Sequence, residues 1–85
     1  MPMKIYVGGL EQISDILESD LKNIFSPFGE IESIDMQRDQ STYKVKGYCY
    51  ITYRKISQAR AAISGMENFR YKGRLLKVAS FLIYR

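Results

Sequence analysis

The chain has 85 residues, enough for one small domain and too few for two. It contains no histidine and one cysteine, Cys49. These counts exclude a Cys/His zinc site, which takes about four ligands, and a disulfide within the chain. They also exclude Ser-His-Asp and Cys-His catalysis. One small core leaves little room for a sizeable cleft, so we expect no enzyme and no cofactor.

The charge is distributed unevenly along the chain. Residues 1–36 carry two lysines against seven acidic residues, a balance of −5, whereas residues 37–85 carry eleven Lys or Arg against two acidic residues, a balance of +9. The basic second half indicates a polyanionic partner, and a solvated surface with lopsided charge is the alternative. No apolar run approaches the ~20 residues of a membrane span, and residues 1–10 do not resemble a signal peptide, so neither membrane insertion nor secretion is expected.

The first half of the chain predicts a strand, a helix and a second strand. Residues 4–10, KIYVGGL, predict a strand that ends in a Gly-Gly turn. The helix is predicted over roughly residues 18–26 and ends at Pro27 and Gly29, and both Asp15 and Ser19 are candidates for its start. Residues 30–37, EIESIDMQ, predict the second strand. The helix over residues 18–26 is predicted from apolar residues at helical spacing, Leu21, Ile24, Phe25 and Phe28.

The second half predicts two more strands around a second helix. Residues 38–46 are polar and predict a loop or hairpin tip, and residues 47–53, GYCYITY, predict a strand. Ser57 is the expected N-cap of a helix that runs to about Ser64 and ends at Gly65. Residues 69–72 predict a connector or short hairpin, and residues 74–80 a fourth strand.

This β-α-β-β-α-β order predicts an α+β fold. It is the split βαβ (ferredoxin-like) arrangement, a four-stranded antiparallel sheet with two helices on one face. The other face of the sheet is then left to solvent or to a ligand.

Alternation along the strands predicts which side chains reach that open face. Ile5 and Val7 are expected to face the helices, which turns Tyr6 outward. Likewise Cys49 is expected to be buried, which turns Tyr48 and Tyr50 outward. Exposed tyrosine rings offer flat surfaces on which bases stack, and cross-strand pairing that stabilises the sheet is the alternative.

Two motifs on these strands resemble those of the RNA recognition motif family. Residues 5–10, IYVGGL, resemble its hexamer, and residues 46–53, KGYCYITY, resemble its octamer, with Cys49 where Gly or Ala is usual. The resemblance covers about residues 3–80 and implies a binding site for single-stranded RNA. We expect residues 1–85 to be one such domain, cut from a longer protein.

The resemblance also implies roles for individual residues. Tyr6, Tyr48 and Tyr50 match the positions whose rings stack on bases, and Lys46 matches the position of a basic residue that contacts phosphate. Alternation places Lys77 outward on the fourth strand. The predicted RNA-binding set is completed by outward Thr52 and by two basic loop residues, Lys44 and Arg38.

Shorter runs narrow the resemblance further. Residues 26–29, SPFG, residues 33–36, SIDM, and the pair Lys46-Gly47 are similar to a domain of the poly-U-binding splicing factors. This implies U-rich or polypyrimidine RNA and a role in pre-mRNA splicing or other mRNA processing. It implies a nuclear location, with the cytoplasm as the alternative, and other splicing proteins or a neighbouring domain of the same kind as partners.

A protein-interaction module is the rival interpretation. Some relatives of this fold bind a tryptophan-bearing peptide through an acidic first helix and an Arg-x-Phe motif after the second helix. Residues 11–20 are acidic, which favours this alternative, although they also fit a solvated face. The matching place reads Phe69-Arg70-Tyr71 and lacks the arginine at its first position.

Overall fold

The computed structural model describes residues 1–13, 16–42 and 45–81, and at Gln12, Val45 and Lys46 it describes the backbone only. Asp15 and Lys44, which the sequence singled out, lie outside the described residues. Four strands form one sheet in the order β2-β3-β1-β6, and every neighbouring pair in it is antiparallel. These strands are β1 (Met3–Gly8), β2 (Ile31–Arg38), β3 (Val45–Tyr53) and β6 (Lys77–Ser80).

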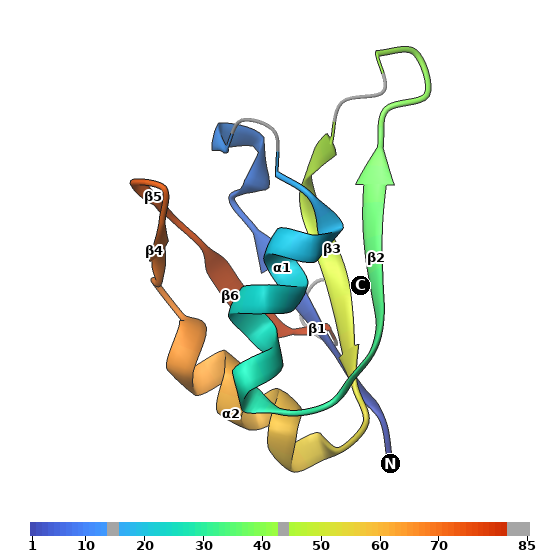
Figure 1. The fold of residues 1–85 in the computed structure, drawn as a ribbon, viewed down its shortest axis with the longest axis vertical. Coiled ribbons are helices and arrows are strands. Elements are labelled where there is room, and N and C mark those ends of the chain that lie inside the picture. Colours follow the sequence, from blue (N-terminus) through green and yellow to red (C-terminus); the bar gives the residue numbers. More distant parts are fainter. Residues whose placement is uncertain (14–15, 43–44, 82–85) are drawn as a thin grey trace.

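Two helices, α1 (Glu18–Phe25) and α2 (Ile56–Met66), lie together on one face of this sheet (Figure 1). The predicted fold class is therefore confirmed, because the elements follow the order of the split βαβ arrangement. The face opposite the helices carries no layer of secondary structure in the described part of the chain (Figure 1). Among the described residues, no helix has the length and apolar character needed to cross a membrane.

The core lies between the sheet and the helices and is built by strand alternation. Ile5, Val7, Cys49, Ile51 and Tyr53 are fully buried, as are the residues that α1 and α2 direct at them. From the helices these are Leu21, Phe25, Ala59 and Ala62. Burial of this apolar set packs one face of the sheet against the helices. Because side chains alternate along a strand, the others must point to the opposite face.

Helix α1 begins where an acidic side chain caps it. Leu17 occupies the N-cap position, and its backbone N–H donates to the Asp20 carboxylate over 2.9 Å. Ser19, a predicted start, lies inside the helix. The predicted end is confirmed, because Phe25 is the last helical residue and a 3₁₀ turn, Ser26–Phe28, follows it before Gly29.

Helix α2 differs from the prediction at both ends. Lys55, not Ser57, is the N-cap residue, and its N–H donates to the Gln58 side chain over 3.1 Å. Gly65 does not end the helix, which continues to Met66. A Cβ at Gly65 would lie 2.5 Å from the Phe28 ring, so this glycine is needed for close packing.

The predicted fourth strand is wrong in its first part. Arg74–Leu75 is strand β5, which pairs with β4 (Arg70–Tyr71) in a separate two-stranded hairpin, and β6 begins only at Lys77. Leu76 between them is buried. The hairpin loop turns tightly through Lys72 and Gly73, whose φ angles are 51° and 79°. The alternative of a short hairpin after the second helix is therefore the correct one.

Candidate nucleic-acid interface

The register of the sheet brings the three predicted tyrosines together on the open face. Tyr6 on β1 lies opposite Tyr50 on β3, and Gly8 lies opposite Tyr48. All three tyrosines are half-buried, whereas their neighbours Val7 and Cys49 are fully buried against the helices. Alternation along two adjacent strands thus produces one aromatic surface, which we call the tyrosine platform (Tyr6, Tyr48 and Tyr50).

The rings of the platform contact one another at two kinds of angle. Tyr6 and Tyr48 have ring centroids 6.0 Å apart and are inclined by only 20°. Tyr50 meets Tyr48 edge-on, at 5.6 Å and 65°, and lies 6.1 Å from Tyr6. The ring planes of Tyr6 and Tyr48 are therefore nearly parallel, and the ring of Tyr50 packs against both at a steep angle.

A glycine in the hexamer motif makes this arrangement possible. A Cβ added at Gly8 would lie 2.6 Å from the hydroxyl oxygen of Tyr6 and 2.8 Å from its ring. The Tyr6 ring therefore lies over Gly8, on the side of Tyr48. Any larger side chain at this position would push the Tyr6 ring off the sheet.

Polar side chains border the platform on its β2 side. Ser33 lies opposite Thr52, and Asp35 lies opposite Tyr50. Asp35 is exposed, and the side-chain amide of Gln37 donates to its Oδ1 over 2.9 Å. These hydroxyl and carboxylate groups can donate to or accept from the edge of a base that rests on the rings.

The predicted basic residues are spread around the ends of the sheet. Lys77 lies opposite Gly8 on β1, on the open face and close to Tyr48 in the register. Arg38 ends β2, is exposed and pairs with Val45 beyond a register shift. The backbone of Lys46 lies in β3, and the placement of its side chain and of Lys44 stays a prediction.

Two further residues belong to this face although the sequence reasoning missed them. The Lys4 ammonium lies 5.6 Å from the ring centroid of Tyr50 and 4.9 Å from that of Phe81. Phe81 meets Tyr50 edge-on at 5.0 Å. Alternation along the first predicted strand would have placed Lys4 on the same face as Tyr6. Phe81 was missed because the fourth predicted strand ended at Ser80, one residue earlier.

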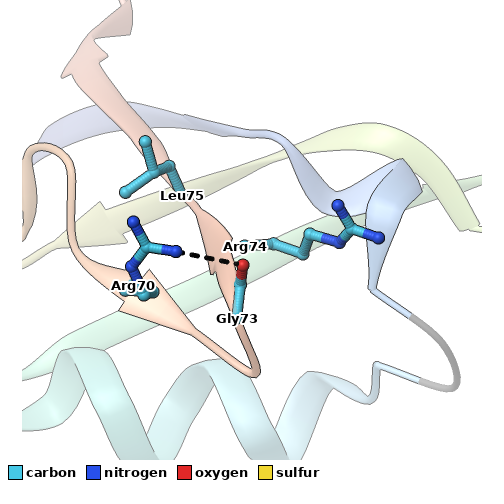
Figure 2. A pocket seen from close by; sticks show the side chains of 4 residues that line it. All are labelled: Arg70, Gly73, Arg74 and Leu75. Carbon is cyan, nitrogen blue, oxygen red and sulfur yellow. Dashed lines mark hydrogen bonds between the residues drawn. The ribbon is translucent and has the colours of Figure 1, made fainter.

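The hairpin of β4 and β5 forms a different basic surface. Arg70, Gly73, Arg74 and Leu75 line an open hollow of about 370 Å³ (Figure 2). Arg70 donates to the carbonyl of Gly73 over 3.5 Å, while the Arg74 side chain extends away from it (Figure 2). Because β5 pairs with β4 alone, Arg74 is not part of the four-stranded sheet that carries the tyrosines.

The lone cysteine is a core residue. Cys49 is fully buried, and its burial raises the pKa of the thiol from 9.0 to about 12, with smaller contributions from the carboxylates of Asp35 and Glu18. The thiol is therefore protonated at neutral pH, and a protonated buried thiol is a poor nucleophile.

We expect the Cys49 thiol to be unreactive in the folded chain. At pH 8, below the raised pKa, a chromogenic disulfide reagent should react only after guanidinium unfolds the protein, because the thiol is then exposed and its pKa is normal. Cys49→Ala should bind the same ligand as the parent chain with unchanged affinity. Rapid reaction of the native protein, or loss of binding by a folded Cys49→Ala variant, would contradict this placement.

Comparison with known proteins agrees with the geometry. Residues 5–77 match the RNA recognition motif family, and the chain belongs to that family. Human "Probable RNA-binding protein 23" is 39% identical over 77 residues, which are 91% of this chain and 17% of the relative. Human "Poly(U)-binding-splicing factor PUF60" is 39% identical over 75 residues, which are 88% of this chain and 13% of the relative.

A solved structure shows the same fold with RNA present. The SXL-lethal protein/RNA complex superimposes with a TM-score of 0.84 at 29% identity, over 92% of this chain and 47% of the other. The predicted family and the similarity to poly-U-binding splicing factors are confirmed. The chain spans less than a fifth of the two curated relatives, 17% and 13% of their lengths.

Proposed function

We propose that this chain is a single-stranded RNA-binding module in which the tyrosine platform stacks bases. The observation that carries the proposal is the gathering of Tyr6, Tyr48 and Tyr50 on the face of the sheet opposite the helices. Stacking on such rings contributes ~1–3 kcal/mol per base and is available to every base. Lys77, and the predicted contacts of Lys46, Lys44 and Arg38, neutralise phosphates around the platform.

The proposal extends to a preference for uridine-rich or polypyrimidine RNA. Stacking alone favours purines, which have larger rings, so a uridine preference needs hydrogen bonds to the base edge. Uracil presents an imino donor between two carbonyl acceptors. Asp35 supplies an acceptor whose orientation Gln37 holds, and Ser33 and Thr52 supply hydroxyl donors beside it.

The cellular role we propose is pre-mRNA splicing or another step of mRNA processing, in the nucleus. It is supported by the 39% identity to a protein named as a poly(U)-binding splicing factor. Other splicing proteins or a neighbouring RNA recognition motif are the partners that fit this role. A neighbouring domain would raise the overall affinity, because linked sites bind the same RNA with an effective concentration set by the linker.

The rival protein-interaction function has less support. On the acidic helix α1, Asp20 accepts from the Leu17 N–H and so serves the helix cap. On the hairpin, the Arg70 guanidinium donates to the Gly73 carbonyl of its own turn. Loss of RNA binding together with capture of a tryptophan-bearing peptide would favour the rival.

A direct titration tests the proposed function. Nine-nucleotide oligouridine, oligocytidine and oligoadenosine are added to the isotopically labelled chain, and amide chemical shifts are followed. Oligouridine is expected to bind more tightly than oligoadenosine and to shift β1 and β3 resonances most. Equal or tighter binding of oligoadenosine would remove the uridine preference, and absence of binding to all three would remove the RNA-binding proposal. Oligodeoxyuridine tests RNA against DNA, because only RNA carries the 2′-OH.

A further inference from the structure

The end of the open face away from Tyr48 carries a second group of side chains. Ser80 lies opposite Ile5, so Phe81 comes next to Lys4 at the start of β1. Phe81 is half-buried, and its ring is nearly perpendicular to that of Tyr50, at 87° and 5.0 Å. The Lys4 ammonium lies close to both rings, 4.9 Å from Phe81 and 5.6 Å from Tyr50.

We propose that Lys4 and Phe81 form an additional nucleotide subsite, in which Phe81 stacks one base and Lys4 donates a hydrogen bond to a carbonyl oxygen of that base. The proposal rests on the proposed RNA-binding function and extends its platform beyond Tyr50. It names a base with carbonyl oxygens, uracil above all, as the occupant.

The position of the Lys4 ammonium supports a contact with a base rather than with a phosphate. The ammonium lies against two ring faces, inside the layer in which bases stack, and attraction to the rings holds it there. Three N–H donors and no acceptor make it complementary to carbonyl oxygens. Uracil has two of these, whereas adenine has none and accepts only at its ring nitrogens.

Phe81 is suited to stacking because its neighbours hold its ring in place and leave it partly exposed. Its edge-on contact with Tyr50 fixes the ring, and the residue is only partly buried. A ring already ordered by its neighbours loses little conformational entropy when a base stacks on it. The opposite role would be a cover that competes with bases for Tyr50, and removal of the ring would then tighten RNA binding.

Replacement of Phe81 tests the subsite. With nine-nucleotide oligouridine, Phe81→Ala should weaken binding by about 5- to 150-fold, as expected for one lost stacked base. Phe81→Leu, which keeps apolar packing on Tyr50, should weaken it nearly as much, because it lacks a ring. Phe69→Ala is the matched control, because Phe69 is also a partly exposed phenylalanine, at 38%, but lies after α2 and outside the four-stranded sheet. Unchanged or tighter binding by folded Phe81 variants overturns the proposal.

Replacement of Lys4 tests the carbonyl contact. Lys4→Met keeps the length of the side chain and removes its donors, and it should weaken oligouridine binding by about 10- to 150-fold, the effect of one hydrogen bond to a charged group. Oligoadenosine binding should change much less. Lys22→Met is the matched control, because Lys22 is an exposed lysine on α1. An equal loss with both RNAs assigns Lys4 to phosphate and overturns the base contact.

Failure of this proposal is distinguishable from failure of the proposed function. If the parent chain binds oligouridine and Tyr48→Ala weakens that binding while Phe81→Ala does not, the platform stands and the subsite is wrong. If the parent chain binds no RNA at all, both are wrong.

Discussion

Replacing Tyr48 with alanine is expected to weaken RNA binding by ~1–3 kcal/mol, about 5- to 150-fold in Kd, without unfolding the chain. The Tyr48 side chain points to the open face and lies outside the core, so its loss removes a stacking surface and leaves no buried cavity. Tyr50→Ala should have an effect of the same size. The measurement is a fluorescence-anisotropy titration with nine-nucleotide oligouridine, with a thermal melt to establish folding.

The conservative variant separates stacking from the hydroxyl group. Tyr48→Phe keeps the ring and is expected to bind much more tightly than Tyr48→Ala. The double variant Tyr48→Ala with Tyr50→Ala should lose less than the sum of the two single effects, because the two rings contact each other at 5.6 Å. If both alanine variants fold and bind like the parent chain, the rings serve the sheet alone and the platform is not the RNA site.

Much of the fold could be predicted because its strands have strong local signals. Residues 47–53 alternate between aromatic or polar outward positions and small or apolar inward positions, and the structure places Cys49, Ile51 and Tyr53 in the core accordingly.

The predicted ends of α2 were wrong for two reasons. At its start the Lys55 N–H donates to the Gln58 side chain, a local capping contact that competes with Ser57 as the N-cap. Near its end Gly65 packs against Phe28, which precedes it by more than thirty residues, so its role is close packing and not termination of the helix.

The candidate site was predictable in part for a similar reason. Alternation on β1 and β3 placed Tyr6, Tyr48 and Tyr50 outward, and the register then brought them together. The contact of Lys4 with Phe81 joins residues near opposite ends of the described chain, and it depends on the pairing of β1 with β6. No local pattern carries that information, since antiparallel register is set by packing across the whole sheet.

The second large effect is expected from salt. The proposed RNA contacts of Lys77, Lys46, Lys44 and Arg38 neutralise about four phosphates, and each contributes ~0.7 to the slope of log Kd against log salt for single strands. A slope near 3 is therefore expected, so a tenfold rise in salt should weaken binding by about 600-fold. Anisotropy titrations with oligouridine at several potassium chloride concentrations measure it.

Single lysine variants test whether the phosphates that cause the salt dependence are bound on the open face. Lys77→Met should lower it by ~0.7, because Lys77 lies on the open face opposite Gly8 and would lose one phosphate contact. Lys22→Met removes the same charge from α1, on the opposite side of the sheet, and should leave the slope unchanged. An equal decrease in both variants would show that the phosphates do not lie beside the tyrosine platform. A slope of zero for the parent chain would show that binding comes from stacking and base contacts alone, and the basic second half of the sequence would then serve another purpose.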